Sequence, residues 1–120
     1  MAVYANLVID RGTDYFSTIN VEGSNGVPYD LTDYFARGSI SKAYNSVAPT
    51  ASFLLTISNP TKGEINMELP NSVTSSMKPG RYVYDIEIYK MVPDGFGGSI
   101  PDDIVRVVEG QVEVTPRAKY

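Results

Sequence analysis

Apolar and polar residues alternate with a period of two along most of the chain. The clearest run covers residues 81–90, where one set of alternate positions holds Tyr82, Tyr84, Ile86 and Ile88. Successive side chains of a β-strand point to opposite faces of its sheet, so we expect this set in a hydrophobic core. The intervening positions are mostly polar or charged and are expected at the surface.

The same alternation predicts six further strands. They cover residues 5–9, 15–21, 34–41, 53–58, 64–69 and 104–114. The last of these has two successive apolar residues, Val107 and Val108, which shift its alternation by one position and predict a β-bulge. Glycine, asparagine and proline separate the strands, and residues 59–63 are expected to form a hairpin turn.

Two segments depart from the strand pattern. Residues 71–77 are expected to form a short helical turn, because Pro70 stands just before them. Residues 91–103 contain two prolines and three glycines and are expected to form a long irregular loop. Regular short strands with turns at this spacing indicate an antiparallel β-sandwich or barrel.

A turn followed by a tyrosine favours the immunoglobulin type of sandwich. Pro79 and Gly80 form the predicted turn, and Tyr82 follows on the core-facing side of the next strand. In a tyrosine corner, the hydroxyl of such a tyrosine forms a hydrogen bond with nearby backbone. The alternative interpretation of this segment is a plain β-turn that leads into the strand. The Trp and Cys residues of antibody cores are absent. We therefore predict an all-β fold, an antiparallel seven-stranded immunoglobulin-like β-sandwich.

Composition excludes several classes of function. The chain has 120 residues, and we interpret residues 1–120 as a single domain with tails at about 1–5 and 115–120. It has neither His nor Cys, so the Ser–His–Asp triad, thiolate nucleophiles and zinc fingers are excluded. A net charge of −4 argues against a nucleic-acid partner. No apolar run reaches the roughly 18 residues of a membrane span.

Carboxylates are the remaining candidates for catalysis. Two neighbouring strands are expected to carry them on one face: Asp85, Glu87, Glu109 and Glu113. Paired carboxylates roughly 5–9 Å apart support glycoside hydrolysis. The alternative, which we favour, is a solvated face balanced by the nearby cations Arg81, Lys90 and Arg106. No apolar pocket that would raise a carboxyl pKa is apparent in the pattern.

A cation site is the other chemistry that acidic residues suggest. Asp94, Asp102 and Asp103 flank a glycine-rich segment and carry oxygens that suit Ca²⁺, but the spacing of an EF-hand is missing. The same segment lacks the Gly-Lys-Ser/Thr ending of a phosphate-binding loop. We therefore predict no catalytic, metal-binding or cofactor-binding residue, no cofactor and no enzymatic activity.

Exposed aromatic residues are better candidates for function. Phe96 stands at the centre of the glycine-rich segment, where it can either anchor in the pocket of a partner or fold back onto the sandwich. Tyr44, Tyr89 and Tyr120 are lesser candidates for the same role, since tyrosine supplies contact area at low entropic cost.

The order of several motifs resembles that of a known family. Residues 30–34 read Asp-Leu-Thr-Asp-Tyr, residues 80–85 read Gly-Arg-Tyr-Val-Tyr-Asp, and residues 110–116 read Gly-Gln-Val-Glu-Val-Thr-Pro. This order is similar to that of small β-sandwich domains of tailed bacteriophages, common in marine cyanophages. These occur as short virion proteins or as N-terminal domains of baseplate and tail-fibre proteins. The sequence departs from the family at Asp33, where the family usually has Gly, and in a longer segment around Phe96.

The resemblance implies a non-enzymatic structural protein of the virion, assembled in the host cytoplasm. Its expected partners are other virion proteins of the tail, baseplate or fibre-attachment apparatus, in a symmetric multi-copy assembly. The residues that this sequence shares with the family are mostly structural, so the resemblance implies no catalytic residue. One alternative is a decoration protein of the capsid. Another is a module that binds host carbohydrate through Phe96 and Tyr44.

Overall fold

The structure is a computed structural model that describes residues 3–23, 26–43 and 49–116. The N-terminal half contains β1 (Val3–Tyr4), β2 (Leu7–Asp10), β3 (Tyr15–Asn20), β4 (Phe35–Ser41) and β5 (Ala51–Ser52). The remaining elements are β6 (Leu54–Asn59), a 3₁₀ turn η1 (Pro60–Lys62), β7 (Glu64–Leu69), α1 (Asn71–Thr74), β8 (Gly80–Pro93) and β9 (Ser99–Thr115). The all-β prediction is confirmed.

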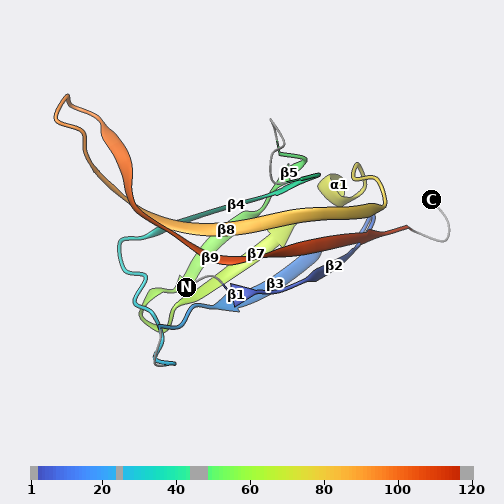
Figure 1. The fold of residues 1–120 in the computed structure, drawn as a ribbon, viewed down its shortest axis with the longest axis horizontal. Coiled ribbons are helices and arrows are strands. Elements are labelled where there is room, and N and C mark those ends of the chain that lie inside the picture. The colour runs from blue at the N-terminus through green and yellow to red at the C-terminus, as the bar shows by residue number, and fades with distance from the viewer. Residues whose placement is uncertain (1–2, 24–25, 44–48, 117–120) are drawn as a thin grey trace.

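Two sheets pack face to face (Figure 1). We call them sheet A, in the order β1-β9-β8-β4-β5 with β2 also paired to β9, and sheet B, in the order β3-β7-β6. With β3, β4, β6, β7, β8 and β9 taken as strands B to G, the orders are B-E-D and G-F-C. These are the two sheets of an immunoglobulin-type sandwich.

The seven predicted strands are all present, but the strand count differs from the prediction. Nine strands are found in the described residues, because the short strands β1 and β5 are additional. The sandwich is also not fully antiparallel, since β1 and β2 both pair with β9 in parallel. Val3 and Tyr4, expected in an N-terminal tail at about residues 1–5, therefore belong to sheet A.

The hydrophobic core forms between the two sheets, as the alternation predicted. Tyr82, Tyr84, Ile86 and Ile88 are all buried on β8. They face Ile65, Met67 and Leu69 of β7 within one cluster of buried side chains.

The predicted tyrosine corner is present in the structure. The hydroxyl of Tyr82 donates a hydrogen bond to the carbonyl oxygen of Lys78 over 2.6 Å, around the turn formed by Pro79 and Gly80. The helical turn α1 precedes this corner, with Pro70 as its N-cap as expected. Buried Thr74 ties α1 to the first half of the chain, since its hydroxyl donates to the carbonyl of Thr13 over 2.7 Å.

The predicted β-bulge also occurs. Ile86 pairs with Val108 and Glu87 pairs with Arg106, so Val107 is an extra residue on β9. Both Val107 and Val108 are buried, because the bulge lets two successive apolar side chains reach the core.

The prediction of an irregular loop at residues 91–103 is wrong. β8 continues to Pro93 and β9 starts at Ser99, so the two strands form a ribbon, which we call the arm (residues 91–103). The three glycines lie within the tip between the strands, and Gly95 and Gly97 adopt positive φ there. Two prolines are tolerated because a two-stranded ribbon leaves its outer edges unpaired.

Candidate protein-binding surfaces

The arm extends beyond the sandwich, so its apolar side chains have no opposing sheet (Figure 1). Met91 and Ile100 of the arm, and Ile104 directly after it, are each exposed over roughly half or slightly less of their surface, and Phe96 at the tip is 94% exposed. The alternative in which Phe96 folds back onto the sandwich is therefore not observed. Large apolar side chains presented together in this way are typical of contact surfaces.

A network of hydrogen bonds shapes the tip around Phe96. One carboxylate oxygen of Asp94 accepts hydrogen bonds from the backbone N–H of Phe96 over 2.7 Å and of Gly98 over 3.1 Å. The N–H of Asp94 also donates to the carbonyl of Gly98 over 3.1 Å. These hydrogen bonds fix the turn at the tip. The segment that carries Phe96 would therefore lose less conformational entropy when it contacts a partner.

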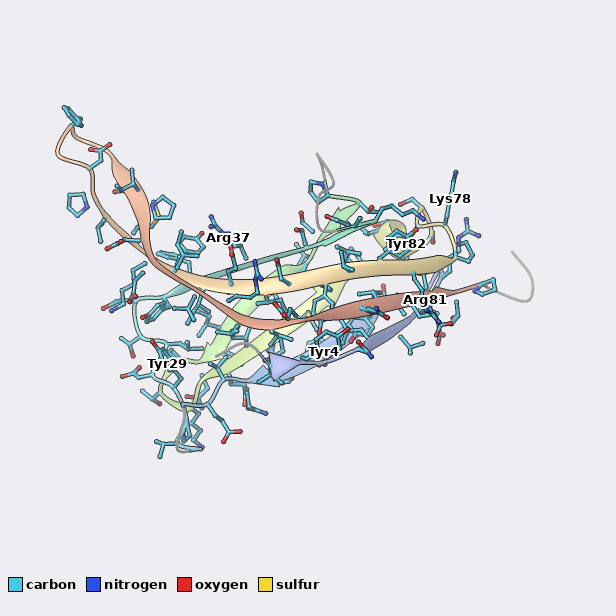
Figure 2. All side chains as sticks on the ribbon, viewed as in Figure 1. Tyr4, Tyr29, Arg37, Lys78, Arg81 and Tyr82 are labelled. Atoms are coloured by element: carbon cyan, nitrogen blue, oxygen red, sulfur yellow. The ribbon has the colours of Figure 1, made fainter. Side chains whose placement is uncertain are left out.

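The base of the arm is fixed to the sandwich through Tyr34. Its hydroxyl donates to a carboxylate oxygen of Asp103 over 2.7 Å and lies 3.3 Å from the hydroxyl of Tyr29. The ammonium group of Lys90 lies 4.8 Å from the centre of the Tyr34 ring. The hydrogen bonds with Tyr29 and Asp103 raise the pKa of Tyr34 above its ordinary value, because they favour the protonated hydroxyl. Figure 2 shows the side chains of the described residues as sticks on the ribbon, with Tyr29 labelled.

Tyr89 lies on the outer face of sheet A next to the base of the arm. Its ring stacks on that of Phe35 with the centroids 5.8 Å apart, and the guanidinium of Arg37 lies 4.9 Å from its centre. Tyr89 is half-buried by these neighbours, whereas Phe35 is 53% exposed. Phe35 was not singled out from the sequence, although its alternation with Tyr34 already placed it on the outer face.

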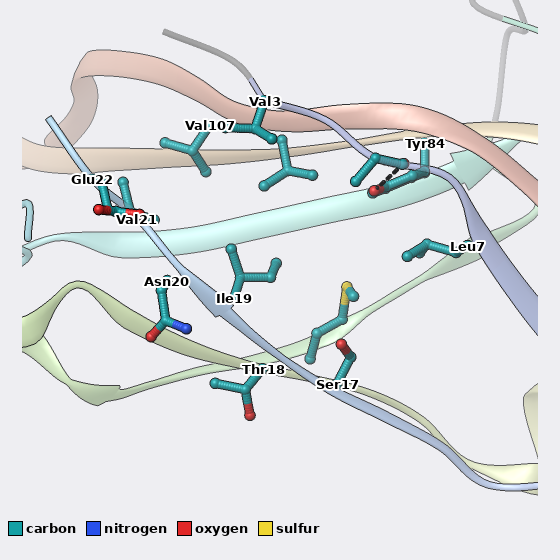
Figure 3. A pocket seen from close by; sticks show the side chains of 13 residues that line it. Val3, Leu7, Ser17, Thr18, Ile19, Asn20, Val21, Glu22, Tyr84 and Val107 are labelled. Atoms are coloured by element: carbon teal, nitrogen blue, oxygen red, sulfur yellow. Dashed lines mark hydrogen bonds between the residues drawn. The ribbon is translucent and has the colours of Figure 1, made fainter. Parts of the chain in front are cut away.

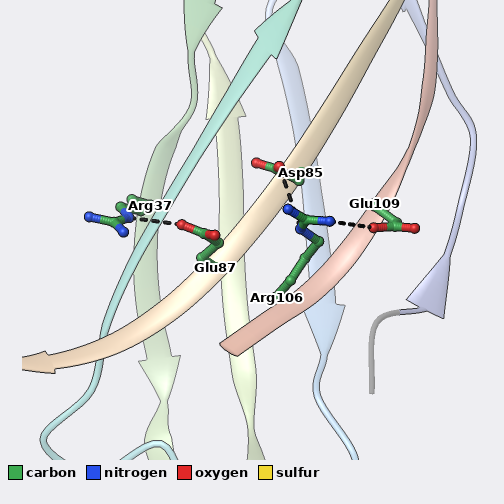
Figure 4. Close-up of polar contacts among 5 residues, drawn as sticks. All are labelled: Arg37, Asp85, Glu87, Arg106 and Glu109. Carbon is green, nitrogen blue, oxygen red and sulfur yellow. Dashed lines mark hydrogen bonds and ion pairs between the residues drawn. The ribbon is translucent and has the colours of Figure 1, made fainter. Parts of the chain in front are cut away.

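The predicted acidic face is a ladder of ion pairs (Figure 4). Arg106 lies 3.6 Å from Asp85 and 3.1 Å from Glu109, and Arg37 lies 3.0 Å from Glu87. Burial raises the pKa of Asp85, and Arg106 opposes that shift. These contacts fit the solvated, charge-balanced face.

Of the three predicted counter-charges, only Arg106 takes part in the ion pairs described above. Lys90 contacts the ring of Tyr34, and Arg81 lies opposite Glu113 in the register of β8 and β9. Arg37 takes part in the ladder instead. Its role was missed because it depends on which strand pairs with β8.

The acidic residues of the arm do not gather into a cation site. Asp94 binds the backbone of the tip, and Asp103 accepts the hydrogen bond of Tyr34. Across residues 3–23, 26–43 and 49–116, no group of three or more metal-ligating side chains is close enough to hold an ion. Tyr44 and Tyr120, the other predicted contact residues, lie outside the described residues.

A second apolar surface lies between the edges of the two sheets (Figure 3). We call it the edge groove; it has a volume of about 220 Å³ and opens between β1 and β3. Apolar side chains form most of its wall, among them Val3, Leu7, Ile19, Met67, Val107 and Val108. The groove was not predicted, because it depends on the N-terminal strands joining β9 of sheet A rather than β3 of sheet B.

Comparison with known proteins gives a weak structural likeness. The fold is similar to part of a family 123 glycoside hydrolase from Clostridium perfringens, solved in a study of glycolipid glycan hydrolysis, with 17% sequence identity and a TM-score of 0.32. The match covers 98% of this chain and 24% of that chain. No protein-family model and no curated protein matches the chain. Among the described residues, no helix is long and apolar enough to cross a membrane.

Proposed function

We propose that the chain is a non-enzymatic structural protein of a tailed bacteriophage virion. In this proposal it docks to other virion proteins in the tail, baseplate or fibre-attachment apparatus. The observation that carries the docking role is the arm with Phe96, 94% exposed, at its tip. An aromatic side chain held outward on an ordered turn is the kind of anchor that dominates the energy of protein interfaces.

Two features support the virion setting. One is the motif order shared with small β-sandwich domains of tailed bacteriophages. The other is Asp33, at the position where that family usually has Gly, which adopts a left-handed φ of 67°. Glycine adopts this conformation without steric cost and aspartate tolerates it better than most residues, so one turn geometry accommodates both.

The carboxylates of the outer face support a role without catalysis. Asp85, Glu87 and Glu109 each have a guanidinium within 4 Å. Glu109 lies opposite Asp85 in the register of β8 and β9, and Arg106 forms an ion pair with each of them. A general acid needs a carboxyl group whose pKa is raised by an apolar site. Burial raises the pKa of Asp85, but Asp85 lies on a polar outer strand face, and the guanidinium of Arg106 opposes the rise.

Immunogold labelling of purified virions tests the proposal. An antibody against the recombinant domain is expected to label the tail, the baseplate or the fibre attachment. Labelling spread over the head would favour the capsid decoration protein instead. Particles that carry no label, together with no peptide of the chain in their mass spectrum, would overturn the virion assignment.

Substitution in the arm tests the docking role separately. Phe96→Ala is expected to reduce incorporation of the protein into particles, because the anchor is removed while the fold is retained. Leu54→Ala is the matched control, since Leu54 is also a large apolar side chain, 59% exposed, on the outer face of sheet B. Equal incorporation of the two variants would argue against docking through the arm.

A further inference from the structure

We propose that the edge groove of one copy receives the arm of a second copy, so that the chain assembles head to tail with itself. This inference rests on the proposed structural role and names one partner for the arm. Donor and acceptor surfaces lie on different parts of the molecule, so each copy can use both at once. Contacts of this heterologous type generate a closed ring or a filament, according to the rotation between copies.

The two surfaces match in chemistry and size. The arm presents Phe96 at its tip and Ile100 on the strand that follows the tip, and the groove is walled mainly by aliphatic side chains such as Ile19 and Val107. An apolar cavity of about 150 Å³ accommodates a benzene molecule. The groove volume of about 220 Å³ is therefore sufficient for the phenyl ring of Phe96.

The mouth of the groove also has an unpaired strand edge. β3 pairs with β7 on one side, and no strand of the described residues pairs with its other side. Ser17, Thr18 and Asn20 of β3 line the groove along that edge. A free edge accepts backbone hydrogen bonds from an incoming segment, and the tip of the arm is such a segment.

The arm of the same copy does not occupy this groove. Figure 1 shows the arm leaving one end of the sandwich and turning away from β1 and β3. None of its residues lines the groove. The apolar side chains of the arm therefore remain uncovered within one copy, and a second copy supplies a matching surface for them.

The charge and the size of the contact determine how the assembly would behave. Each copy has a net charge of −4, so copies repel at low ionic strength and salt is expected to strengthen the association. An arm tip in a groove buries less area than the roughly 1,200–2,000 Å² of a stable interface. We therefore expect a weak contact in solution, which covalent trapping detects better than chromatography.

Disulfide trapping tests the inference, because the chain has no cysteine of its own. Ser99→Cys places a thiol beside the tip without removing Phe96, and Asn20→Cys places one at the mouth of the groove. Both positions are exposed. When the two variants are mixed under mild oxidation, we expect a mixed disulfide dimer, identified by an affinity tag on one of them.

Two controls make the result specific. Leu54→Cys, on β6 at the opposite edge of sheet B, is expected to couple to Ser99→Cys several times more slowly than Asn20→Cys does. Adding Phe96→Asp to the Ser99→Cys chain is expected to bring coupling to Asn20→Cys down to that control rate. Equal rates for both acceptors, or a product dominated by Ser99→Cys self-dimers, would overturn the inference.

The outcomes separate this inference from the proposed function. A chain that labels the phage tail but gives no preferred mixed disulfide overturns the self-docking alone. A preferred mixed disulfide from a chain that is absent from purified particles overturns the virion role alone.

Discussion

Gly110 is the position where a single added methyl group should loosen the N-terminal strands. A Cβ at Gly110 would overlap the carbonyl oxygen of Ala5, which belongs to the backbone and has no flexible end to move. Gly110 itself does not have a left-handed φ, so Gly110→Ala introduces no strain of its own. The expected cost therefore comes from displacing residues 5 and 6 from β9.

Three hydrogen bonds depend on that close approach. The N–H of Ala5 donates to the carbonyl of Glu109 over 2.9 Å, and the hydroxyl of Tyr84 donates to the carbonyl of Ala5 over 2.6 Å. The side-chain oxygen of Asn6 accepts from the N–H of Gln111 over 3.1 Å. At about 1 kcal/mol each, their loss costs about 3 kcal/mol.

An opposing effect is smaller than this loss. Replacing Gly by Ala restricts the unfolded chain and stabilises the fold by roughly 0.4–1 kcal/mol. The net expectation for Gly110→Ala is a loss of about 2 kcal/mol in the free energy of unfolding. For a chain of this length, that corresponds to a fall of about 8 °C in the melting temperature.

Urea unfolding followed by circular dichroism measures this loss, and a double-mutant cycle tests its cause. Tyr84→Phe alone removes one of the three bonds and is expected to cost about 1 kcal/mol. Because Gly110→Ala already breaks that bond, the double variant should lose less than the sum of the two single losses. Unchanged stability of Gly110→Ala, or strictly additive losses in the cycle, would refute the reasoning.

Three further predictions concern tyrosines and the arm. Tyr82→Phe removes the hydrogen bond to Lys78 and should lower the free energy of unfolding by about 1–2 kcal/mol in urea denaturation; no change would mean that the corner adds nothing to stability. Phe96→Ala should change that free energy by less than about 0.5 kcal/mol, whereas Ile86→Ala in the core should cost about 2–5 kcal/mol; similar losses would show that Phe96 packs in the fold. Because the pKa of Tyr34 is raised in the folded state, stability should be fully present below the unfolded pKa of about 10 and fall as the pH rises through the folded pKa. Tyr34→Phe should flatten that alkaline decline in pH-dependent unfolding, and an equally steep decline in the variant would contradict the assignment.

The strands and the bulge were predictable because they follow from local alternation. The paired Val107 and Val108 indicated the bulge from sequence spacing alone, without knowledge of the partner strand. The arm could not be predicted in this way, because the prolines and glycines of residues 91–103 are typical of an irregular loop. In the structure the glycines shape only the tip, and the prolines sit in a ribbon with free outer edges.

Features that depend on which strands pair could not be predicted from the sequence alone. The ion pair of Arg37 with Glu87 needs the register of β4 against β8, which alternation does not define. The same holds for the parallel pairing of β2 with β9, since alternation gives the faces of a strand but not its direction. The edge groove follows from that pairing, and for this reason no sequence signal marked it.

The pairing of β1 and β2 with β9 also constrains when the domain can fold. Asn6 bonds to Gln111, a residue 105 positions later in the chain, and Val3 lies opposite Val108. During synthesis on the ribosome, the first strands have no native partner until the last strand of the fold has emerged. Contacts of such wide sequence separation make folding slow, because the chain must close a long loop before the pairing forms. Until then, β2 and the apolar side chains that it covers in the folded domain stay exposed. They can then be bound by chaperones or by neighbouring nascent chains.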